Sequence, residues 1–435
     1  MFPNLKKWGG GRPSSHIEKV NYAVDTLCLL PVISCVLILG IITDTCRNKS
    51  LFDSFYSKIL ITITVSFVIS SCLAKNTIDA WFGLPNFLPF FLLFLCFQTI
   101  ITKIKYLYKL IFLLSLSASI IVIIGLLQLY FNLDWPNWLS LLFGWDVIPF
   151  GNPEGRMSSI FYHANILGLF LVITFNFSLC LLLINSELIF FKISRKKNNY
   201  FLILNIFFTL IGIFLTNSRS AWVMAFLTFI AYAVYGRWYK ILSFLTVIIT
   251  AISWASFGNL PGQYFFRQVV PSFIWLRFSD QMFPQRPTPT LRISQWQFCL
   301  DLIRDNPVMG VGLRNFDYLY EQTTGFRMGH PHSLFLMLGA ETGLISLLLT
   351  CIFVGVILRR GALVFLTQKW QSNESLIIFS YLIAFANFIF FNLADLSIFD
   401  LRLNILGWII LASIAGVSQK SLIDKCLPTS HSPFP

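Results

Sequence analysis

The first residues to suggest chemistry are two histidines at the mouth of a long apolar segment. His330 and His332 flank a proline, and Ser333 then leads into an apolar run that contains one carboxylate, Glu341. An imidazole titrates near neutral pH and can take a proton from a reacting hydroxyl. A carboxylate inside an apolar run is costly and is a functional candidate by default. The plainer interpretation is that the histidines cap a helix at the surface and that a neighbour satisfies Glu341.

The polar stretch before these histidines has an unusual choice of cation. Residues 258–332 contain no spanning apolar run, seven arginines and no lysine. The arginines are Arg267, Arg277, Arg286, Arg292, Arg304, Arg314 and Arg327. A guanidinium fork matches two oxygens of a phosphate or carboxylate, so this loop favours recognition of an anion. Chance together with exclusion of lysine is the alternative.

Three further segments are expected to reach the same face. Arg156 and Asn165 belong to a polar segment that opens a predicted span. Arg219 lies in a very short turn between two spans, where it cannot move far; its plainer role is an anchor at the membrane interface. A third segment begins at Arg292, and its apolar residues have helical spacing that would let it lie along the bilayer surface. These apolar residues are Ile293, Trp296, Leu300 and Ile303.

The composition of the chain indicates that membrane-spanning helices position these residues. The chain is 56% hydrophobic and 12% charged, with a mean hydropathy of +0.73, which excludes a soluble domain. A spanning helix needs about 20 apolar residues, and eleven runs qualify. They lie near 24–43, 58–74, 81–101, 110–131, 160–185, 200–217, 220–236, 241–257, 333–358, 376–395 and 401–417. We expect an all-α polytopic transmembrane bundle of about 11–12 spans, with kinks at Pro31 and at Pro85 and Pro89.

Basic residues set the orientation. If residues 258–332 are exterior, the interior connections hold seventeen Lys and Arg and the short exterior ones only four, as the positive-inside rule requires. The same rule explains the net charge of +13 without nucleic acid. One conflict remains, because eleven spans place the basic N-terminal tail outside. Either the count near residues 20–60 is wrong or the first run is re-entrant. Of the nine cysteines only Cys299 lies in the exterior loop, so no disulfide framework is expected.

Four motifs together resemble the O-antigen ligase and O-antigen polymerase superfamily of bacterial envelope glycosyltransferases. They are Arg-x-Ser-x-x-Phe-x-x-x-Asn at 156–165, Ser-Arg-Ser-Ala-Trp at 218–222, Arg292 with Asn-Pro-x-x-Gly-x-Gly at 306–312, and His332-Ser333 followed at a fixed distance by Gly343. The resemblance covers about 150–345. It implies a ligase-like core at 151–358 that includes the loop 258–332. Residues 1–150 would be N-terminal transmembrane helices, and 359–435 C-terminal transmembrane helices with a cytoplasmic tail.

The resemblance implies an inner-membrane enzyme with its active face in the periplasm. It would transfer a glycan from a polyprenyl-pyrophosphate carrier to a hydroxyl of a glycan or lipid-linked acceptor, without a metal or other cofactor. His332 would be the base, and Arg219 and Arg292 would hold the diphosphate as its charge grows. The remaining candidates are substrate-binding Arg156, Asn165, Arg314 and His330, and Glu341 as a supporting residue that pairs with Arg219. Ligase and polymerase stay equally open.

Two alternatives carry distinct expectations. His330 and His332 could bind a metal with His163 as a third ligand, although zinc prefers three or four ligands and no cysteine cluster accompanies them. A transporter, like the relatives labelled as inorganic-carbon transporters, would place polar or broken-helix features near mid-membrane in matched halves. Here the polar groups gather at one face and no repeat is evident.

Overall fold

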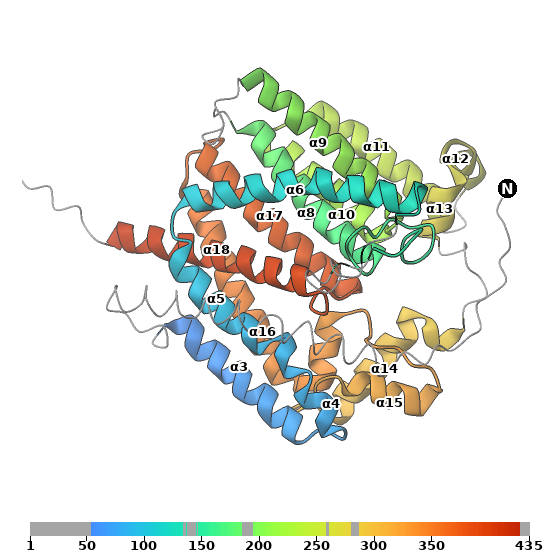
Figure 1. Cartoon of the computed structure of the whole chain (residues 1–435), viewed down its shortest axis with the longest axis vertical. Coiled ribbons are helices and arrows are strands. Elements are labelled where there is room, and N and C mark those ends of the chain that lie inside the picture. The colour runs from blue at the N-terminus through green and yellow to red at the C-terminus, as the bar shows by residue number, and fades with distance from the viewer. Residues whose placement is uncertain are drawn as a thin grey trace, which may run out of the picture.

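The computed structural model describes residues 54–133, 136, 145, 147–184, 195–257, 261–279 and 287–426. Within these ranges the chain is helical and has no strand (Figure 1). The first elements are α3 (Phe55–Cys72), α4 (Thr77–Trp81), η2 (Leu84–Asn86), α5 (Leu88–Ile100), α6 (Ile104–Tyr130), α8 (Ala164–Leu183), α9 (Arg195–Leu215), α10 (Arg219–Tyr235) and α11 (Tyr239–Ser256). The others are α12 (Gln263–Val269), α13 (Ser272–Phe278), η3 (Thr288–Thr290), α14 (Arg292–Asp305), α15 (Asn315–Thr324), α16 (Leu334–Thr367), α17 (Asn373–Ala394) and α18 (Leu401–Cys426).

The prediction of a polytopic helical bundle is confirmed. Eight of the described segments are long and apolar enough to cross a membrane, and α9 and α10 supply two shorter apolar helices. Ten of the eleven predicted spans correspond to these helices. The first predicted run at 24–43, with Pro31 and the conflict over the N-terminal tail, lies outside the described residues.

Proline interrupts the second described span where the sequence predicted a kink. Pro85 lies in the 3₁₀ turn η2 and Pro89 in the first turn of α5. Proline lacks an N–H and is tolerated only in the first turn of a helix. The segment therefore breaks into α4, η2 and α5 instead of forming one straight helix.

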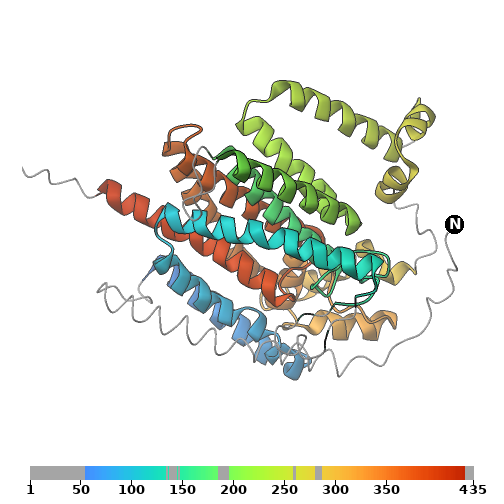
Figure 2. The same cartoon turned by 45° about the horizontal axis from the view of Figure 1, so that its top comes forward.

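The bundle is centred on α8, with a second group of helices around α16. Helix α8 packs against α6, α9, α10 and α17, and 83% of its span is buried, compared with 11% for α11 at the edge. Helix α16 packs against α3, α17 and α18, and α5 lies along α18 (Figures 1 and 2). Buried amides tie neighbouring helices together. For example, Asn387 donates to Thr228 at 3.0 Å and Asn205 donates to Ser178 at 2.9 Å. Such bonds replace the hydrophobic driving force that is missing in lipid.

The predicted exterior loop folds as two separate helical pairs. Helices α12 and α13 pack on α11, whereas α14 and α15 pack on the first half of α16 (Figures 1 and 2). The apolar stripe expected along α14 is split. Ile303 approaches Gly339 of α16, but Ile293 and Leu300 stay 67% and 50% exposed. The face of α14 that packs on the protein instead carries Gln295 and Cys299, both 0% exposed.

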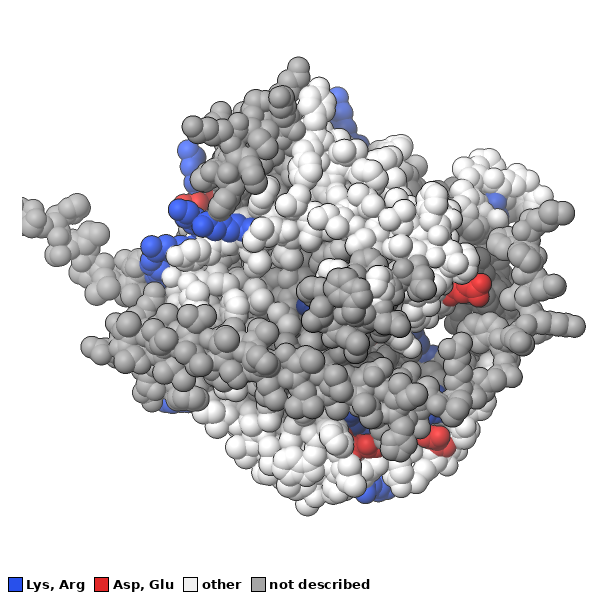
Figure 3. All heavy atoms as spheres, in the orientation of Figure 1, with Lys and Arg blue, Asp and Glu red and all other residues white. Residues whose placement is uncertain are grey.

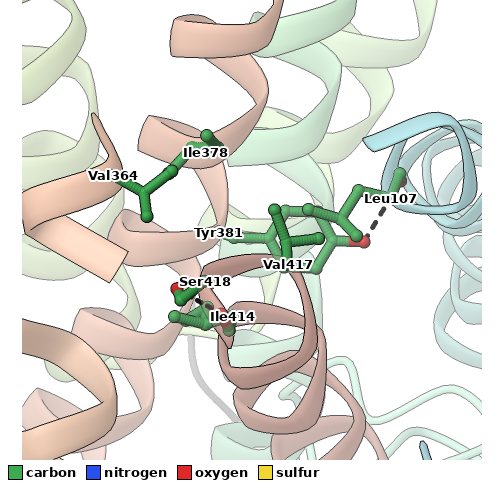
Figure 4. A pocket seen from close by; sticks show the side chains of 7 residues that line it. All are labelled: Leu107, Val364, Ile378, Tyr381, Ile414, Val417 and Ser418. Atoms are coloured by element: carbon green, nitrogen blue, oxygen red, sulfur yellow. Dashed lines mark hydrogen bonds between the residues drawn. The ribbon is translucent and has the colours of Figure 1, made fainter. Parts of the chain in front are cut away.

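The two ends of the bundle differ in character. Figure 3 shows Lys and Arg side chains gathered near the end where α6 begins, next to a largely uncharged surface. A small apolar cavity lies toward the same end, between α6, α16, α17 and α18 (Figure 4). It is lined by Leu107, Val364, Ile378, Tyr381, Ile414, Val417 and Ser418. Tyr381 crosses it and donates to the Leu107 carbonyl at 3.1 Å. The polar residues predicted to do chemistry lie at the other end.

Candidate active site

His332 is held by its own loop and by two neighbouring elements. Its φ is +52°, and its backbone N–H donates to His330 Nδ1 at 3.3 Å. The indole of Trp296 on α14 donates to the carbonyl of Pro331 at 3.0 Å. The His330 ring stacks on Phe399, with 5.6 Å between ring centroids. The loop that carries both imidazoles is therefore fixed between α14 and the segment before α18.

His332 is paired with a carboxylate from the end of α17. Its Nδ1 lies 3.1 Å from Asp395 Oδ1. Burial raises the pKa of Asp395, but the hydrogen bond from His332 and the charges of His332, His330 and Arg292 lower it more, so the net pKa lies well below its usual range. An ionised carboxylate only accepts hydrogen bonds, so Nδ1 of His332 carries the proton and Nε2 is left as the basic nitrogen.

The turn after α17 places Asp395. Asn392 in the last turn of α17 binds Ser397 twice: its Oδ1 accepts from the backbone N–H of Ser397 and its Nδ2 donates to the Ser397 hydroxyl, each at 3.0 Å. The backbone N–H of Leu396 donates to Asp395 Oδ1 at 3.0 Å. The side chain of Asp395 is 9% exposed and that of His332 is 29% exposed. The carboxylate is thus buried behind an imidazole that is partly exposed.

A second chain of hydrogen bonds fixes the other carboxylate oxygen. Asn165 Nδ2 donates to Asp395 Oδ2 at 2.8 Å, and Arg156 donates to Asn165 Oδ1 at 2.6 Å. Arg156 also donates from Nε to the carbonyl of Thr216 at 2.8 Å. Asn165 lies in the first turn of α8, where its backbone N–H is capped by His163 Nδ1 at 3.1 Å. Arg156, Asn165, Asp395 and His332 form one connected series.

Arginines surround this series. Arg292, the first residue of α14, lies 3.9 Å from Asp395 Oδ2 and is 37% exposed. Arg219 donates to the backbone carbonyl of Arg277 at 2.9 Å, and Arg277 donates to the carbonyl of Asn217 at 2.6 Å. Burial and the charges of Arg277 and Arg219, only partly opposed by Asp395, lower the pKa of Arg156 to about 10. Four guanidinium groups therefore act on one small region.

Helix direction adds to the positive potential. Helices α8, α10, α14, α16 and α18 all begin at this end of the bundle, at Ala164, Arg219, Arg292, Leu334 and Leu401. A helix N-terminus carries about half a positive charge, and its unpaired N–H groups favour anions. An imidazole with a buried carboxylate partner thus lies beside an electropositive region.

Comparison with known families finds a match in the middle of the chain. Residues 204–351, about a third of the chain, match the family model described as O-Antigen ligase. This match supports the resemblance to the O-antigen ligase superfamily that the sequence motifs predicted. No curated protein sequence matches it. The matched ligase segment contains Arg219, Arg277, Arg292 and His332, whereas Arg156, Asn165 and Asp395 are supplied by the flanking parts of the chain.

The structure brings together most residues that the ligase motifs singled out. His332, Arg292 and Asn165 contact Asp395 directly. Arg156 joins them through Asn165 and His330 through the backbone of His332. Arg219 joins them through Arg277 and through its electrostatic effect on Arg156. Arg314 belongs elsewhere, because its backbone N–H and its charge act on Glu341.

The predicted pairing of Glu341 with Arg219 is wrong. Glu341 Oε1 accepts from the backbone N–H of Phe316 at 3.2 Å, and the backbone of Arg314 binds the same carboxylate. The cause is a break in α16 at Gly343, which has φ +84°. There the turn 307–312 replaces the helical hydrogen bonds: Val311 and Gly312 donate to the carbonyls of Ala340 and Glu341 at 3.0 and 2.8 Å, and Leu344 donates to that of Pro307 at 2.8 Å.

This break explains two of the ligase motifs. The helical segment from Leu334 to the break is short, and the Asn-Pro-x-x-Gly-x-Gly turn caps its C-terminal end. A Cβ at Gly343 would collide with the Val308 carbonyl, and one at Gly310 would collide with the backbone of Glu341. The spacing from His332 to Gly343 is therefore the length of a rigid short helix, and Glu341 supports the turn that ends it.

Asp395 is the residue that sequence analysis missed. A signal existed, since Asp395 is a carboxylate at the end of the apolar run 376–395 and the predicted topology puts that end on the exterior face. It lies beyond the segment 150–345 that resembles the ligases and 63 residues from His332. A carboxylate in an apolar run is a functional candidate, and this applies to Asp395 as it does to Glu341.

The same cluster has the donor set of a metal site. His330, His332 and Asp395 each offer one ligand atom, and these atoms lie within 4.8 Å of one another. Asp395 is already engaged by His332, Asn165 and the Leu396 N–H. Arg292 and Arg156 lie close by, and their charges oppose a further cation. The geometry therefore suits a hydrogen-bonded base better than a metal centre, and chelation is the direct test.

Proposed function

We propose that this chain is a membrane glycosyltransferase that moves a glycan from a polyprenyl-pyrophosphate carrier to an acceptor hydroxyl, without a metal. It would act at the periplasmic face of a bacterial inner membrane. The observation that carries the proposal is the His332–Asp395 pair, 3.1 Å apart, beside Arg292 and near Arg219, in a region where five helices begin. The match of residues 204–351 to the O-antigen ligase family model supports it.

The proposed reaction needs one base and one anion site. Nε2 of His332 takes the proton of the acceptor hydroxyl as its oxygen bonds to the anomeric carbon of the donor glycan. The bond from that carbon to the pyrophosphate oxygen breaks, and its electron pair leaves with the polyprenyl pyrophosphate. Arg219 and Arg292 stabilise the negative charge that develops on the leaving group. The products are the extended acceptor, polyprenyl pyrophosphate and a proton, which His332 releases to solvent.

Asp395 has a defined part in this scheme. Its carboxylate keeps the proton of His332 on Nδ1 and stabilises the imidazolium that forms when Nε2 is protonated. Arg156 and Asn165, first expected to bind substrate, hold that carboxylate through two hydrogen bonds. In this proposal the segment 151–358 supplies the base and the arginines, 359–435 supplies Asp395, and 1–150 frames the bundle.

The polar groups argue against the transporter alternative. They gather at the start of α8, α10, α14, α16 and α18, whereas a transporter would place them at mid-membrane in two matched halves. Among the described spans, helix α16 carries a buried carboxylate and is interrupted at Gly343. The turn 307–312 fills this break.

The glycan profile of a deletion strain tests the proposal. Loss of long glycan chains would identify a polymerase, and intact chains left on the carrier lipid would identify a ligase. Restoration by the wild-type gene but not by a His332→Ala gene, with equal protein in the membrane, is the expected result. An unchanged glycan profile in the deletion strain would contradict the proposed function.

A further inference from the structure

Helix α13 is joined to the α9–α10 turn by two arginines. Arg219 at the start of α10 donates to the carbonyl of Arg277 in the last turn of α13. Arg277 reaches back and donates to the carbonyl of Asn217, just before α10. Each guanidinium is therefore oriented by the backbone of the other element, and both lie close enough to Arg156 for their charges to act on it.

Aromatic side chains of α9, α10 and α13 continue from this junction. Phe214 of α9 stacks on Trp222 of α10, with 5.8 Å between ring centroids. Phe273 of α13 packs edge-on against Phe214 at 6.0 Å, and Phe278 lies 6.5 Å from Trp222. Phe214 and Phe273 are 54% and 41% exposed. An aromatic surface made by three helices thus begins where Arg219 and Arg277 meet.

We infer that Arg277 is a further diphosphate-binding arginine and that the aromatic surface of Phe214, Trp222, Phe273 and Phe278 receives the first isoprenoid units of the donor. This inference rests on the proposed function. A polyprenyl pyrophosphate has a charged head joined directly to an apolar chain, and the junction offers guanidinium groups joined directly to an apolar surface. Mutual repulsion of Arg156, Arg219 and Arg277 would be relieved by a bound diphosphate.

Short soluble ligands separate the two halves of the inference. The purified full-length protein is titrated with inorganic pyrophosphate and with farnesyl pyrophosphate, and affinity is measured by microscale thermophoresis. Wild type should bind farnesyl pyrophosphate more tightly. Arg277→Ala should weaken both ligands by about 10- to 100-fold, the worth of a charge-assisted hydrogen bond. Arg277→Lys keeps the charge but not the fork, so it should lose less.

Phe273→Ala should weaken farnesyl pyrophosphate by about 3- to 10-fold and leave inorganic pyrophosphate unchanged, since only apolar contact is lost. Two matched controls lie on α12. Arg267 stacks on Trp275 and donates to the carbonyl of Ala255, and Phe265 is 61% exposed outside the aromatic surface. Arg267→Ala and Phe265→Ala should bind both ligands as wild type does.

The outcomes separate this inference from the proposed function. Normal binding of both ligands by Arg277→Ala, or equal effects of Phe273→Ala on both ligands, would overturn the inference even if wild type transfers glycan. A wild-type protein that binds neither ligand would instead count against a lipid-pyrophosphate donor, and so against both.

Discussion

Replacement of Asp395 by asparagine tests the base most selectively, because it preserves shape and removes charge. The carboxylate accepts from His332 and Leu396 on Oδ1 and from Asn165 on Oδ2. An amide has one oxygen and one NH₂ group. With its oxygen toward Asn165, the NH₂ faces His332 and forces the proton onto Nε2, so the base is lost. With its oxygen toward His332, the NH₂ faces the NH₂ of Asn165, which cannot flip without losing Arg156.

The expected loss follows from the role of a general base. Such a group contributes about 10²–10⁴ in rate, which is about 3–5 kcal/mol of transition-state stabilisation. Asp395→Asn should therefore lower kcat by about 10²–10⁴, because one amide orientation removes the basic nitrogen, the other conflicts with Asn165, and neither supplies the charge that stabilises the imidazolium. Donor affinity should change little, since the arginines that hold the diphosphate remain.

The assay uses purified protein in nanodiscs with a lipid-linked glycan donor and an excess of acceptor, and it reports kcat and donor KM separately. Asp400→Asn is the matched control. Asp400 is equally buried, with 9% side-chain exposure, but it pairs with Arg402 at 3.0 Å. A folded Asp395→Asn protein with kcat within threefold of wild type would refute the proposed pairing of His332 and Asp395.

Three other outcomes are expected. Burial lowers the pKa of His163 to about 4 and that of His330 to about 3. Both imidazoles are therefore neutral in the folded protein. The stability that they contribute is complete above a pH of about 6.5 and is lost as the pH falls toward those pKa values. The melting temperature should therefore be flat from pH 7 to 8 and fall below pH 6.5, and a constant value down to pH 4 would contradict this. Gly343→Ala should lower the free energy of unfolding by about 2–5 kcal/mol, because of the positive φ and the collision of the added Cβ with the Val308 carbonyl. Gly355→Ala on the same helix has nothing near its added Cβ, so it should leave the free energy of unfolding unchanged. EDTA should leave the rate of glycan transfer unchanged, and inhibition reversed by a divalent ion would establish the metal alternative.

Hydropathy was sufficient to predict most of the spans. Lipid requires every spanning backbone group to be satisfied within its helix, so apolar length alone locates helices such as α6 and α8. The kink predicted near Pro85 is also confirmed, because proline has no N–H for a helical hydrogen bond. Hydropathy does not predict which face of a surface helix is buried. The buried face of α14 depends on where Gly339 lets it approach α16, and this contact left Ile293 and Leu300 exposed.

The candidate site was likewise predictable only in part. Residue types predicted a base and anion-binding arginines, and His332, Arg292 and Arg156 do meet. The partner of His332 depended on the position of the end of α17 relative to the start of α16, which is a matter of helix packing across 63 residues. The error over Glu341 came from assuming a continuous helix, when the positive φ of Gly343 admits the turn 307–312.

Glycan transfer by purified His332→Ala protein tests the proposed chemistry most directly. Wild type, His330→Ala and His332→Ala are each given a polyprenyl-pyrophosphate-linked glycan and acceptor, and the product is identified by mass. Wild type should form the product, and His330→Ala should be only mildly slowed. His332→Ala should be folded and inserted but slower by about 10²–10⁴. Product formation by His332→Ala at a near-normal rate would contradict the assignment of His332 as the base.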